Sequence, residues 1–248
     1  MKLRNIVAVV ATLTLAVGVQ AQKTSLRVMT YDVHNGVGSD KVHSYDRIAE
    51  VITAQKPNVI ALQEMDSVTT RFADYVLGEI AERTGMHSYY APAINYAGGK
   101  YGVGILSDSP ALSVRQYPLP CPSEPRTLLI VEFENYYFGC THLPMNATEC
   151  MAAVLRIEEI VTSLDKPFLL GGNINAEPHD AEIQKFREFA TILTPTDTPT
   201  WNELYPGVQP NCIDYIFYRG DRKIKVRNAQ VLQSIAAEHL PLVVDVKF

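Results

Sequence analysis

The amino-acid sequence predicts a single domain with a mixed α/β fold and more than one β-sheet. The chain has 248 residues, of which 47% are hydrophobic and 20% charged, so it has enough apolar surface to bury a large core. Apolar runs typical of buried strands alternate with segments that have a helical apolar face. Several strand-like runs follow one another with no helix between them, which argues against a purely parallel sheet.

The expected helices are recognised by an apolar stripe or by their start and stop signals. The first stripe runs from Tyr45 to Ile52, and Pro57 stops that helix. Gly85 ends the second helix, and Asn146 begins the third in the manner of an N-cap. The four helices are expected at roughly residues 45–56, 72–83, 146–164 and 181–189.

Strands are expected where short apolar runs are bounded by turn residues. The basic stretch 219–227 is expected to form an exposed edge strand or hairpin. The expected strands cover residues 26–33, 59–63, 101–107, 127–133, 136–141, 167–171, 213–218, 224–233 and 241–248. No repeat and no linker rich in glycine, serine or proline divides the chain, so residues 22–248 are expected to form one domain.

The composition excludes three classes of protein. The chain is too apolar for intrinsic disorder, and its 14 glycines and 15 prolines are too few for a fibrous protein. A formal net charge of −5 argues against a protein that coats nucleic acid through bulk positive charge.

Residues 1–21 have the pattern of a secretory signal peptide. Lys2 and Arg4 precede an apolar run over residues 6–17, and cleavage is expected before Gln22. A membrane span needs about 20 apolar residues, so an anchor is the less favoured interpretation. The sequence therefore predicts an exported protein, periplasmic or extracellular, with no transmembrane segment in the remainder. Without residues 1–21 the net charge becomes −7.

The four cysteines do not form a CxxC pair, so a zinc site is not expected. Buried free thiols and disulfides both remain open for them, because export permits disulfides and because some lie in apolar runs. These cysteines are Cys121, Cys140, Cys150 and Cys212.

Polar residues recur where the predicted strands end. Such positions favour binding and catalysis, because strand ends gather at the edges of a sheet. Asp214 is also unusual, since a carboxylate within the apolar run IDYIF needs a partner. The polar segments are 31–35, 63–64, 141–143, 172–175 and 238–239.

Seven motifs, taken in order, resemble those of the endonuclease/exonuclease/phosphatase superfamily. They are MTYDVHNG, IALQEMD, YGVGILSDSP, THLP, LLGGNINAEP, TPTWNELYPGVQPNCIDYIF and AEHLPLVVDV. The superfamily includes secreted DNases, abasic-site endonucleases, neutral sphingomyelinases and inositol-polyphosphate phosphatases, and this chain resembles a secreted bacterial-type member. The resemblance covers nearly all of residues 26–248. It implies a four-layer α/β/β/α sandwich, two mixed sheets flanked by helices, and divalent-metal-dependent hydrolysis of a phosphate ester.

The resemblance also implies a metal site for Mg²⁺ or Mn²⁺. Glu64 of the Q-E motif would bind the ion, and Asp32 and Glu238 are further candidate ligands. A sparse set of carboxylates suits Mg²⁺, which keeps several waters and takes substrate phosphate oxygens.

The remaining catalytic roles follow from the same resemblance. His239 matches the closing histidine, which Asp214 would orient, and His142 matches a histidine that contacts the phosphate or the leaving group. Asn175 would hydrogen-bond the phosphate or the attacking water. Arg126 could add positive charge near the phosphate, although an ordinary surface arginine is the favoured interpretation.

Three positions depart from the family pattern: Asp32 replaces an asparagine, Asn173 replaces an aspartate, and Glu238 replaces an aspartate. The change at Asn173 matters most, because an amide cannot accept the proton of a nucleophilic water. Two interpretations follow. Asp32 and Asn173 have exchanged catalytic roles, or the site has become a phosphate- or metal-binding pocket without turnover. The residues that remain favour the exchange.

The loops at 95–100 and 117–126 are nearly uncharged, whereas enzymes that cleave duplex DNA grip its backbone with basic loops. The sequence therefore favours a small or lipid-derived phosphate ester as the partner over nucleic acid, with a secreted nuclease as the second alternative. Trp201 and Tyr205 are expected to wall a loop beside the site. The other four histidines (His34, His43, His87 and His179) are expected mostly at the surface.

Overall fold

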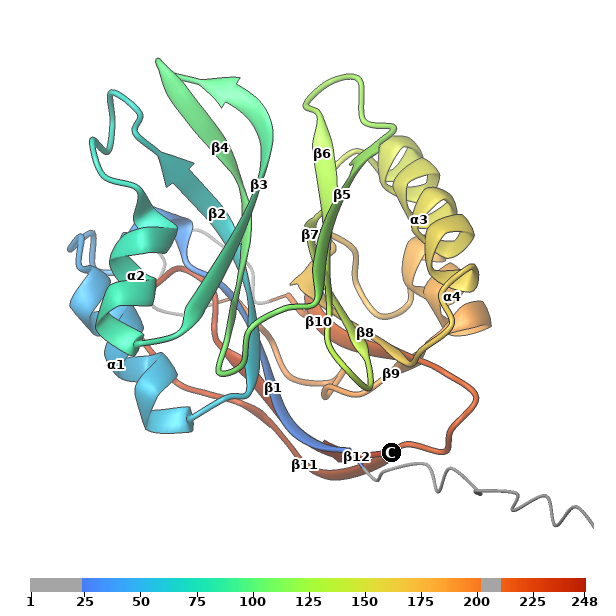
Figure 1. Cartoon of the computed structure of the whole chain (residues 1–248). Coiled ribbons are helices and arrows are strands. Elements are labelled where there is room, and N and C mark those ends of the chain that lie inside the picture. The colour runs from blue at the N-terminus through green and yellow to red at the C-terminus, as the bar shows by residue number, and fades with distance from the viewer. Residues whose placement is uncertain (1–23, 202–210) are drawn as a thin grey trace, which may run out of the picture.

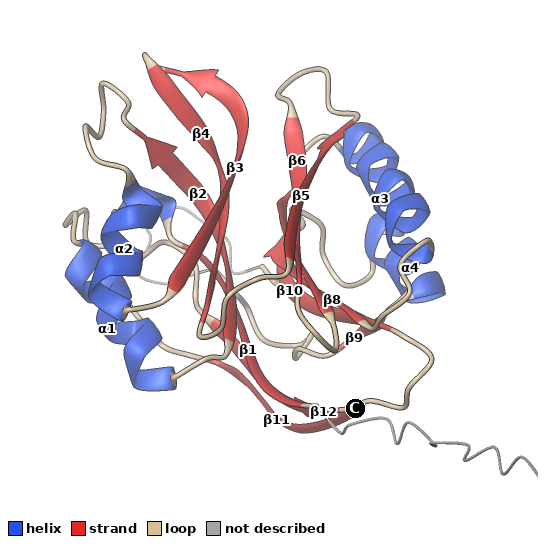
Figure 2. Ribbon diagram, viewed as in Figure 1, coloured by secondary structure: helices blue, strands red, loops and turns tan. Residues whose placement is uncertain are grey.

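The computed structural model describes residues 24–201 and 211–248. The predicted signal peptide and Tyr205 lie outside these residues. Two six-stranded mixed sheets pack face to face, and helices cover both outer faces (Figure 1). Figure 2 shows the order helix, sheet, sheet, helix across the molecule. The four-layer sandwich expected from the sequence is confirmed.

The first sheet has the strand order β11-β12-β1-β2-β4-β3. Only the pair β1–β2 is parallel, and the other neighbours in this sheet are antiparallel. Its strands are β1 (Ser25–Asp32), β2 (Val59–Ser67), β3 (His87–Tyr96), β4 (Gly99–Ser107), β11 (Lys225–Val231) and β12 (Leu242–Lys247).

The second sheet has the order β5-β6-β7-β8-β10-β9, with β7–β8 as its parallel pair. Gly171 lies where this sheet meets the first one, since a Cβ atom there would sit 2.8 Å from Cβ of Ala61. Its strands are β5 (Ser113–Leu119), β6 (Arg126–Glu132), β7 (Tyr137–His142), β8 (Phe168–Asn173), β9 (Thr191–Ile192) and β10 (Asp214–Arg219).

Helices α1 (Tyr45–Gln55) and α2 (Val76–Thr84) cover the first sheet, and α3 (Ala147–Thr162) and α4 (Ala181–Phe189) cover the second. The side chain of Asn146 accepts a hydrogen bond from the backbone N–H of Glu149, so the expected N-cap of the third helix is confirmed. Helix α2 begins later than residue 72, because the preceding residues form a turn in which Thr69 N–H bonds the carbonyl of Phe72.

Three apolar layers make up the core. One lies between the sheets and the other two lie under the helices, and together they hold most of the buried aliphatic and aromatic side chains. All four cysteines are buried free thiols, which settles the alternative that the sequence left open. No helix in the described residues is long and apolar enough to cross a membrane.

The strand register brings the polar strand ends to one edge of the sandwich. In the first sheet Asp32 pairs with Gln63 across the parallel strands β1 and β2. In the second sheet Asn173 pairs with His142 on one side and with Asp214 on the other. Strand pairing within each sheet and the packing of the two sheets together gather these residues at one end of the molecule.

Candidate active site

A hydrogen bond between Asp32 and Asn173 joins the two sheets at this edge. The Nδ2 atom of Asn173 donates to Oδ2 of Asp32 over 3.1 Å, and both side chains are buried. The backbone N–H of His34 also bonds Oδ1 of Asp32, at 3.3 Å. Burial raises the pKa of Asp32, and the neighbouring Asp214 carboxylate adds to this effect. Thus two of the three positions at which this chain departs from the family pattern are in direct contact.

Glu64 reaches the site through a β-bulge. The register of β2 against β4 shifts between Leu62 and Met65, and Glu64 within the bulge has a φ of 60°, in the left-handed region. A bulge can change the direction of a side chain, and a non-glycine residue in the left-handed region is strained. The strained backbone of the bulge therefore sets the position of the Glu64 carboxylate. Burial and the charge of Asp32 raise the pKa of Glu64 to about 7.

The carboxylates of Asp32 and Glu64 fit a divalent cation. One potential ligand atom from each of Asp32, Glu64 and His142 lies within 4.8 Å of the others. Burial first, and the charge of Asp32 second, raise the pKa of Glu64, and a cation between the two carboxylates would stabilise their ionised forms. Oxygen ligands of this kind suit Mg²⁺ and Mn²⁺.

His142 is held as a neutral imidazole with a defined tautomer. The Nδ2 atom of Asn175 donates to the carbonyl of Leu143 at 2.8 Å, which fixes the amide, and it also lies 3.2 Å from Nε2 of His142. Nε2 therefore accepts, and Nδ1 carries the proton. Burial lowers the pKa of His142 well below its usual value, and the positive charge of Arg126 lowers it further. Because Nδ1 is protonated, His142 can act as a hydrogen-bond donor, and the carboxylates of Asp32 and Glu64 are the groups of this cluster that could hold a metal ion.

His239 and Asp214 form a buried ion pair. Nδ1 of His239 donates to Oδ2 of Asp214 at 2.7 Å, and the hydroxyl of Thr200 donates to the same oxygen at 2.6 Å. Burial alone would lower the pKa of His239, but the charges of Asp214 and Asp32 raise it to about 10. Trp201 stacks on the imidazole with ring centroids 4.9 Å apart. The structure thus places Trp201 beside the site, as expected, and holds His239 as an imidazolium.

Glu238 is not in the group of Asp32, Glu64 and His142 that the described residues bring together, so its place among the metal ligands stays a prediction. Its Oε1 atom lies 2.8 Å from Nδ1 of His34 and 3.7 Å from Nζ of Lys41. Hydrogen bonding to Glu238 raises the pKa of His34. His34 was expected at the surface with no particular role. Its contact with Glu238 instead connects the loop after β1 to the segment before β12.

Arg126 corrects a further expectation. It is 9% exposed, so it is not an ordinary surface arginine. His43 is exposed, as expected, and its ring stacks against Phe72 with centroids 4.7 Å apart and meets the edge of Tyr45. In the sequence, Arg126 comes directly before an apolar strand, which indicated that it could be a functional residue. No pattern in the sequence shows where its side chain packs.

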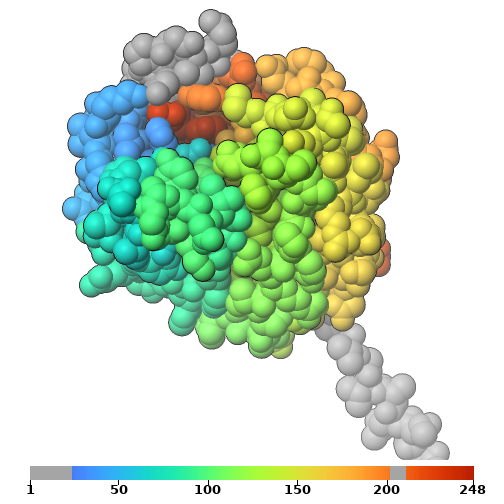
Figure 3. All heavy atoms as spheres, turned by 90° about the horizontal axis from the view of Figure 1, so that it is seen from above, coloured from blue at the N-terminus to red at the C-terminus, as the bar shows by residue number. Residues whose placement is uncertain are grey.

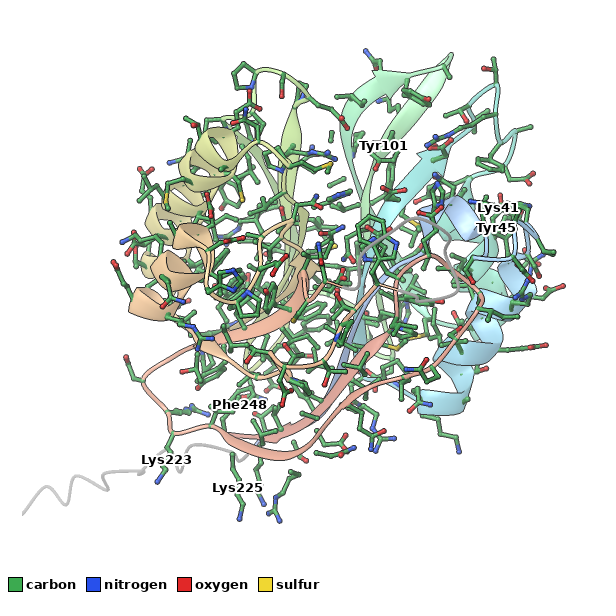
Figure 4. The ribbon with its side chains drawn as sticks, turned by 180° about the vertical axis from the view of Figure 1, so that it is seen from behind. Lys41, Tyr45, Tyr101, Lys223, Lys225 and Phe248 are labelled. Carbon is green, nitrogen blue, oxygen red and sulfur yellow. The ribbon has the colours of Figure 1, made fainter. Side chains whose placement is uncertain are left out.

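The site opens on one end of the sandwich. Figure 3 shows a hollow on this face, with red atoms of the C-terminal segment below a rim of blue, green and yellow atoms. Figure 4 shows Lys223 and Lys225 at the opposite end of the sandwich from Tyr101, which lies between the upper ends of the sheets. The basic stretch 219–227 is therefore remote from the site, and from Lys225 it runs into β11, the exposed edge strand that the sequence predicts.

Several solved structures share the fold of this chain. An endonuclease/exonuclease/phosphatase from Beutenbergia cavernae DSM 12333 is 22% identical with a TM-score of 0.77, covering 90% of this chain and 72% of that one. Mannosyl-6-phosphatase from Bacteroides thetaiotaomicron VPI-5482 is 16% identical with a TM-score of 0.74, covering 90% and 100%. The human Nocturnin catalytic domain with bound sulfate is 18% identical with a TM-score of 0.65, covering 92% and 97%. At these identities the likeness shows the fold alone.

No curated protein sequence matches the chain. A family model described as "Endonuclease/Exonuclease/phosphatase family" matches residues 29–233, and this family consists in general of metal-dependent phosphoesterases. Since the matched region spans most of the sequence and the fold agrees, the chain belongs to the endonuclease/exonuclease/phosphatase family.

Proposed function

We propose that this protein is a divalent-metal-dependent phosphoesterase that hydrolyses a small phosphomonoester or phosphodiester. The observation that carries the proposal is the 3.1 Å hydrogen bond between Asn173 and Asp32. The family pattern has an asparagine at the position of Asp32 and an aspartate at the position of Asn173. This chain therefore keeps one carboxylate and one amide, with their positions exchanged. The exchange preserves both the net charge and the hydrogen-bonding chemistry.

Glu64, with Asp32 beside it, would hold the cation, Mg²⁺ or Mn²⁺. A divalent cation bound there would neutralise negative charge that develops on the phosphoryl oxygens during hydrolysis.

Asp32 is the proton acceptor for the attacking water in this proposal. Its carboxylate is buried in contact with Asn173 and has the proton-accepting oxygens that the Asn173 amide lacks. Each carboxylate oxygen has two lone pairs, so Oδ2 can accept from Asn173 and still face a water. Asn173 in turn fixes the orientation of the carboxylate, because its own Oδ1 is bound by the backbone N–H of Asn175 at 3.0 Å.

Two histidines supply hydrogen-bond donors. His239 is an imidazolium fixed through Nδ1 by Asp214, so its Nε2–H is directed by that bond and stabilises negative charge on a phosphoryl oxygen. The Nδ1–H of His142 has no partner among the described residues and is buried, so it is available to a ligand oxygen. The two donors are preorganised and lose little freedom when substrate binds.

The charge distribution favours a small substrate over duplex DNA. The cationic stretch of residues 219–227 lies at the far end of the sandwich, and the chain is acidic overall. A duplex would need basic groups around the site to neutralise its phosphates. We further propose that the protein is exported to the periplasm or the cell exterior, on the basis of the signal-like residues 1–21.

The proposal is tested with three substrates: p-nitrophenyl phosphate, bis(p-nitrophenyl) phosphate and, at low salt, plasmid DNA. Hydrolysis of the two small esters and nicking of the plasmid are measured. We expect turnover of a small ester with Mg²⁺ or Mn²⁺, its loss in EDTA, and its recovery when metal is restored. Asp32→Asn should lower kcat by about 10²- to 10⁴-fold, because a general base is removed. Asp221→Asn, at an exposed position in the remote loop, is the matched control.

Three outcomes would contradict the proposal. Wild-type protein that binds Mg²⁺ without turning over any ester would identify the alternative, a binding protein on an enzyme fold. Efficient plasmid nicking with no small-ester turnover would identify a nuclease. Turnover that persists in EDTA would exclude the metal-dependent mechanism.

A further inference from the structure

The end of the sandwich opposite the candidate active site is strongly basic. Residues 219–227 contain five lysines and arginines and one aspartate, which gives this stretch a charge of +4. The chain without residues 1–21 has a net charge of −7, so its positive charge is concentrated in one place. Lys223 and Lys225 lie at the end of the molecule remote from Tyr101 (Figure 4). The proposed mechanism therefore leaves these cations without a role.

The fold itself makes little use of these cations. Lys223, Lys225 and Arg227 are exposed, and none of them pairs with a carboxylate among the described residues. Lys225 lies directly opposite Lys247 in the antiparallel register of β11 and β12, and like charges so placed destabilise a strand pair. Charges on an edge strand prevent pairing with another sheet, but Lys247 is on an interior strand and Lys223 is in a loop. The arrangement therefore points to an anion outside the protein.

A polar hollow of about 600 Å³ continues this basic surface. It lies between the end of α4 and the turn from β10 to β11. Glu188 in its lining is paired with Lys185 at 2.7 Å, so cations prevail there. Guanidinium groups suit the oxygens of a phosphate head group. The charged residues that line the hollow are Arg187, Arg219, Arg222, Lys223, Glu188 and Asp221.

The chain also enters the fold at the basic end. Thr24, the first described residue, exchanges two backbone hydrogen bonds of 2.9 and 3.0 Å with Phe248, and Figure 4 shows Phe248 beside Lys223 and Lys225. The apolar run of the predicted export signal covers residues 6–17. The residues between this run and Thr24 can span at most about 25 Å. While the apolar run lies in a membrane, the basic end is therefore held near the membrane surface.

We propose that the basic end, defined as residues 219–227 with Lys247, docks on the surface of an anionic lipid bilayer. Acidic phospholipid head groups would neutralise its unpaired cations and separate the opposed lysines. The candidate active site, at the other end of the sandwich, then faces the aqueous phase and takes its substrate from solution. This inference goes beyond the proposed function and does not depend on it.

Cosedimentation of the full chain with lipid vesicles tests the inference. An equimolar mixture of phosphatidylglycerol and phosphatidylcholine is compared with phosphatidylcholine alone, which measures any binding through the apolar segment. The double variant Lys223→Gln with Lys225→Gln should bind the mixed vesicles about 10- to 30-fold more weakly than the wild type, and added salt should weaken wild-type binding. Lys100→Gln with Arg115→Gln, at exposed positions on β4 and β5, makes the same change in net charge and should bind as the wild type does.

The outcomes separate this inference from the proposed function. Lysine-dependent binding to the mixed vesicles without turnover of any ester would support the docking surface and contradict the phosphoesterase. Equal binding of the wild type and the Lys223/Lys225 variant to the mixed vesicles would overturn the inference, and so would an equal loss in the control variant. Binding to dextran sulfate but not to anionic vesicles would identify a polysaccharide partner and overturn it as well.

Discussion

Replacing Asp214 with Asn is expected to lower the pKa of His239 and to destabilise the protein in a pH-dependent way. The two side chains are buried and joined by a 2.7 Å hydrogen bond, so the variant leaves an imidazole without its anionic partner. Removing an opposite charge at this distance lowers a histidine pKa by about 1 to 3 units. The pKa of His239 should therefore fall from about 10 toward its usual range.

The expected loss in the free energy of unfolding is about 3–5 kcal/mol below pH 6.5, as for other broken buried ion pairs. The sign of the pH dependence follows from the raised pKa. In the unfolded chain His239 titrates near 6.5, so the pair's contribution is fully present below that pH and is lost as pH rises through about 10. The difference between wild type and variant should therefore shrink from pH 6.5 to pH 9.5.

Urea unfolding followed by circular dichroism at both pH values measures this difference, and NMR of the His239 ring measures its pKa directly. Asp221→Asn, which removes an exposed carboxylate in the loop after β10, should leave both quantities unchanged. A wild-type His239 that titrates near 6.5, or an equal destabilisation of the Asp214 variant at both pH values, would refute the ion-pair account.

Three further predictions concern the metal site, the support of Asp214 and the thiols. Because burial and Asp32 raise the pKa of Glu64 to about 7, protons compete with the metal, and calorimetry should show Mg²⁺ binding about tenfold tighter at pH 8 than at pH 6. Glu64→Gln should abolish this pH dependence. Thr200→Val removes the 2.6 Å hydrogen bond to Asp214 and should cost about 1–3 kcal/mol in urea unfolding; an unchanged midpoint would contradict it. Thiol titration of the denatured protein without reductant should find four thiols per chain, and a lower number would reveal a disulfide at one of Cys121, Cys140, Cys150 and Cys212.

The sequence predicts the central strands well and the edges poorly. Central strands such as β7 and β8 are continuous apolar runs buried on both faces, which is a strong local signal. Strands β3 and β5 were not expected, because each is half-exposed and contains a proline, Pro92 or Pro118. Strand β9 has two residues and carries no pattern at all.

The position of the site follows from the strand ends, whereas its contacts depend on the fold. Strand pairing places His142 beside Asn173 in one sheet and Asp32 beside Gln63 in the other, and the face-to-face packing of the two sheets then brings Asp32 to Asn173. The 2.8 Å contact between His34 and Glu238 joins segments far apart in the chain. No local pattern encodes such a partner, although the place of His34 two residues after Asp32 was a usable hint.

The central claim is that Asp32 and Asn173 have exchanged roles, and a double exchange tests it most directly. The single variant Asp32→Asn leaves two amides in contact and should lose metal-dependent phosphoesterase activity by about 10²- to 10⁴-fold. The double variant Asp32→Asn with Asn173→Asp restores one carboxylate and one amide at the same place, and its kcat should return to within about tenfold of the wild type. An Asp32→Asn variant as active as the wild type, or an inert wild type that Asn173→Asp alone activates, would contradict the exchange.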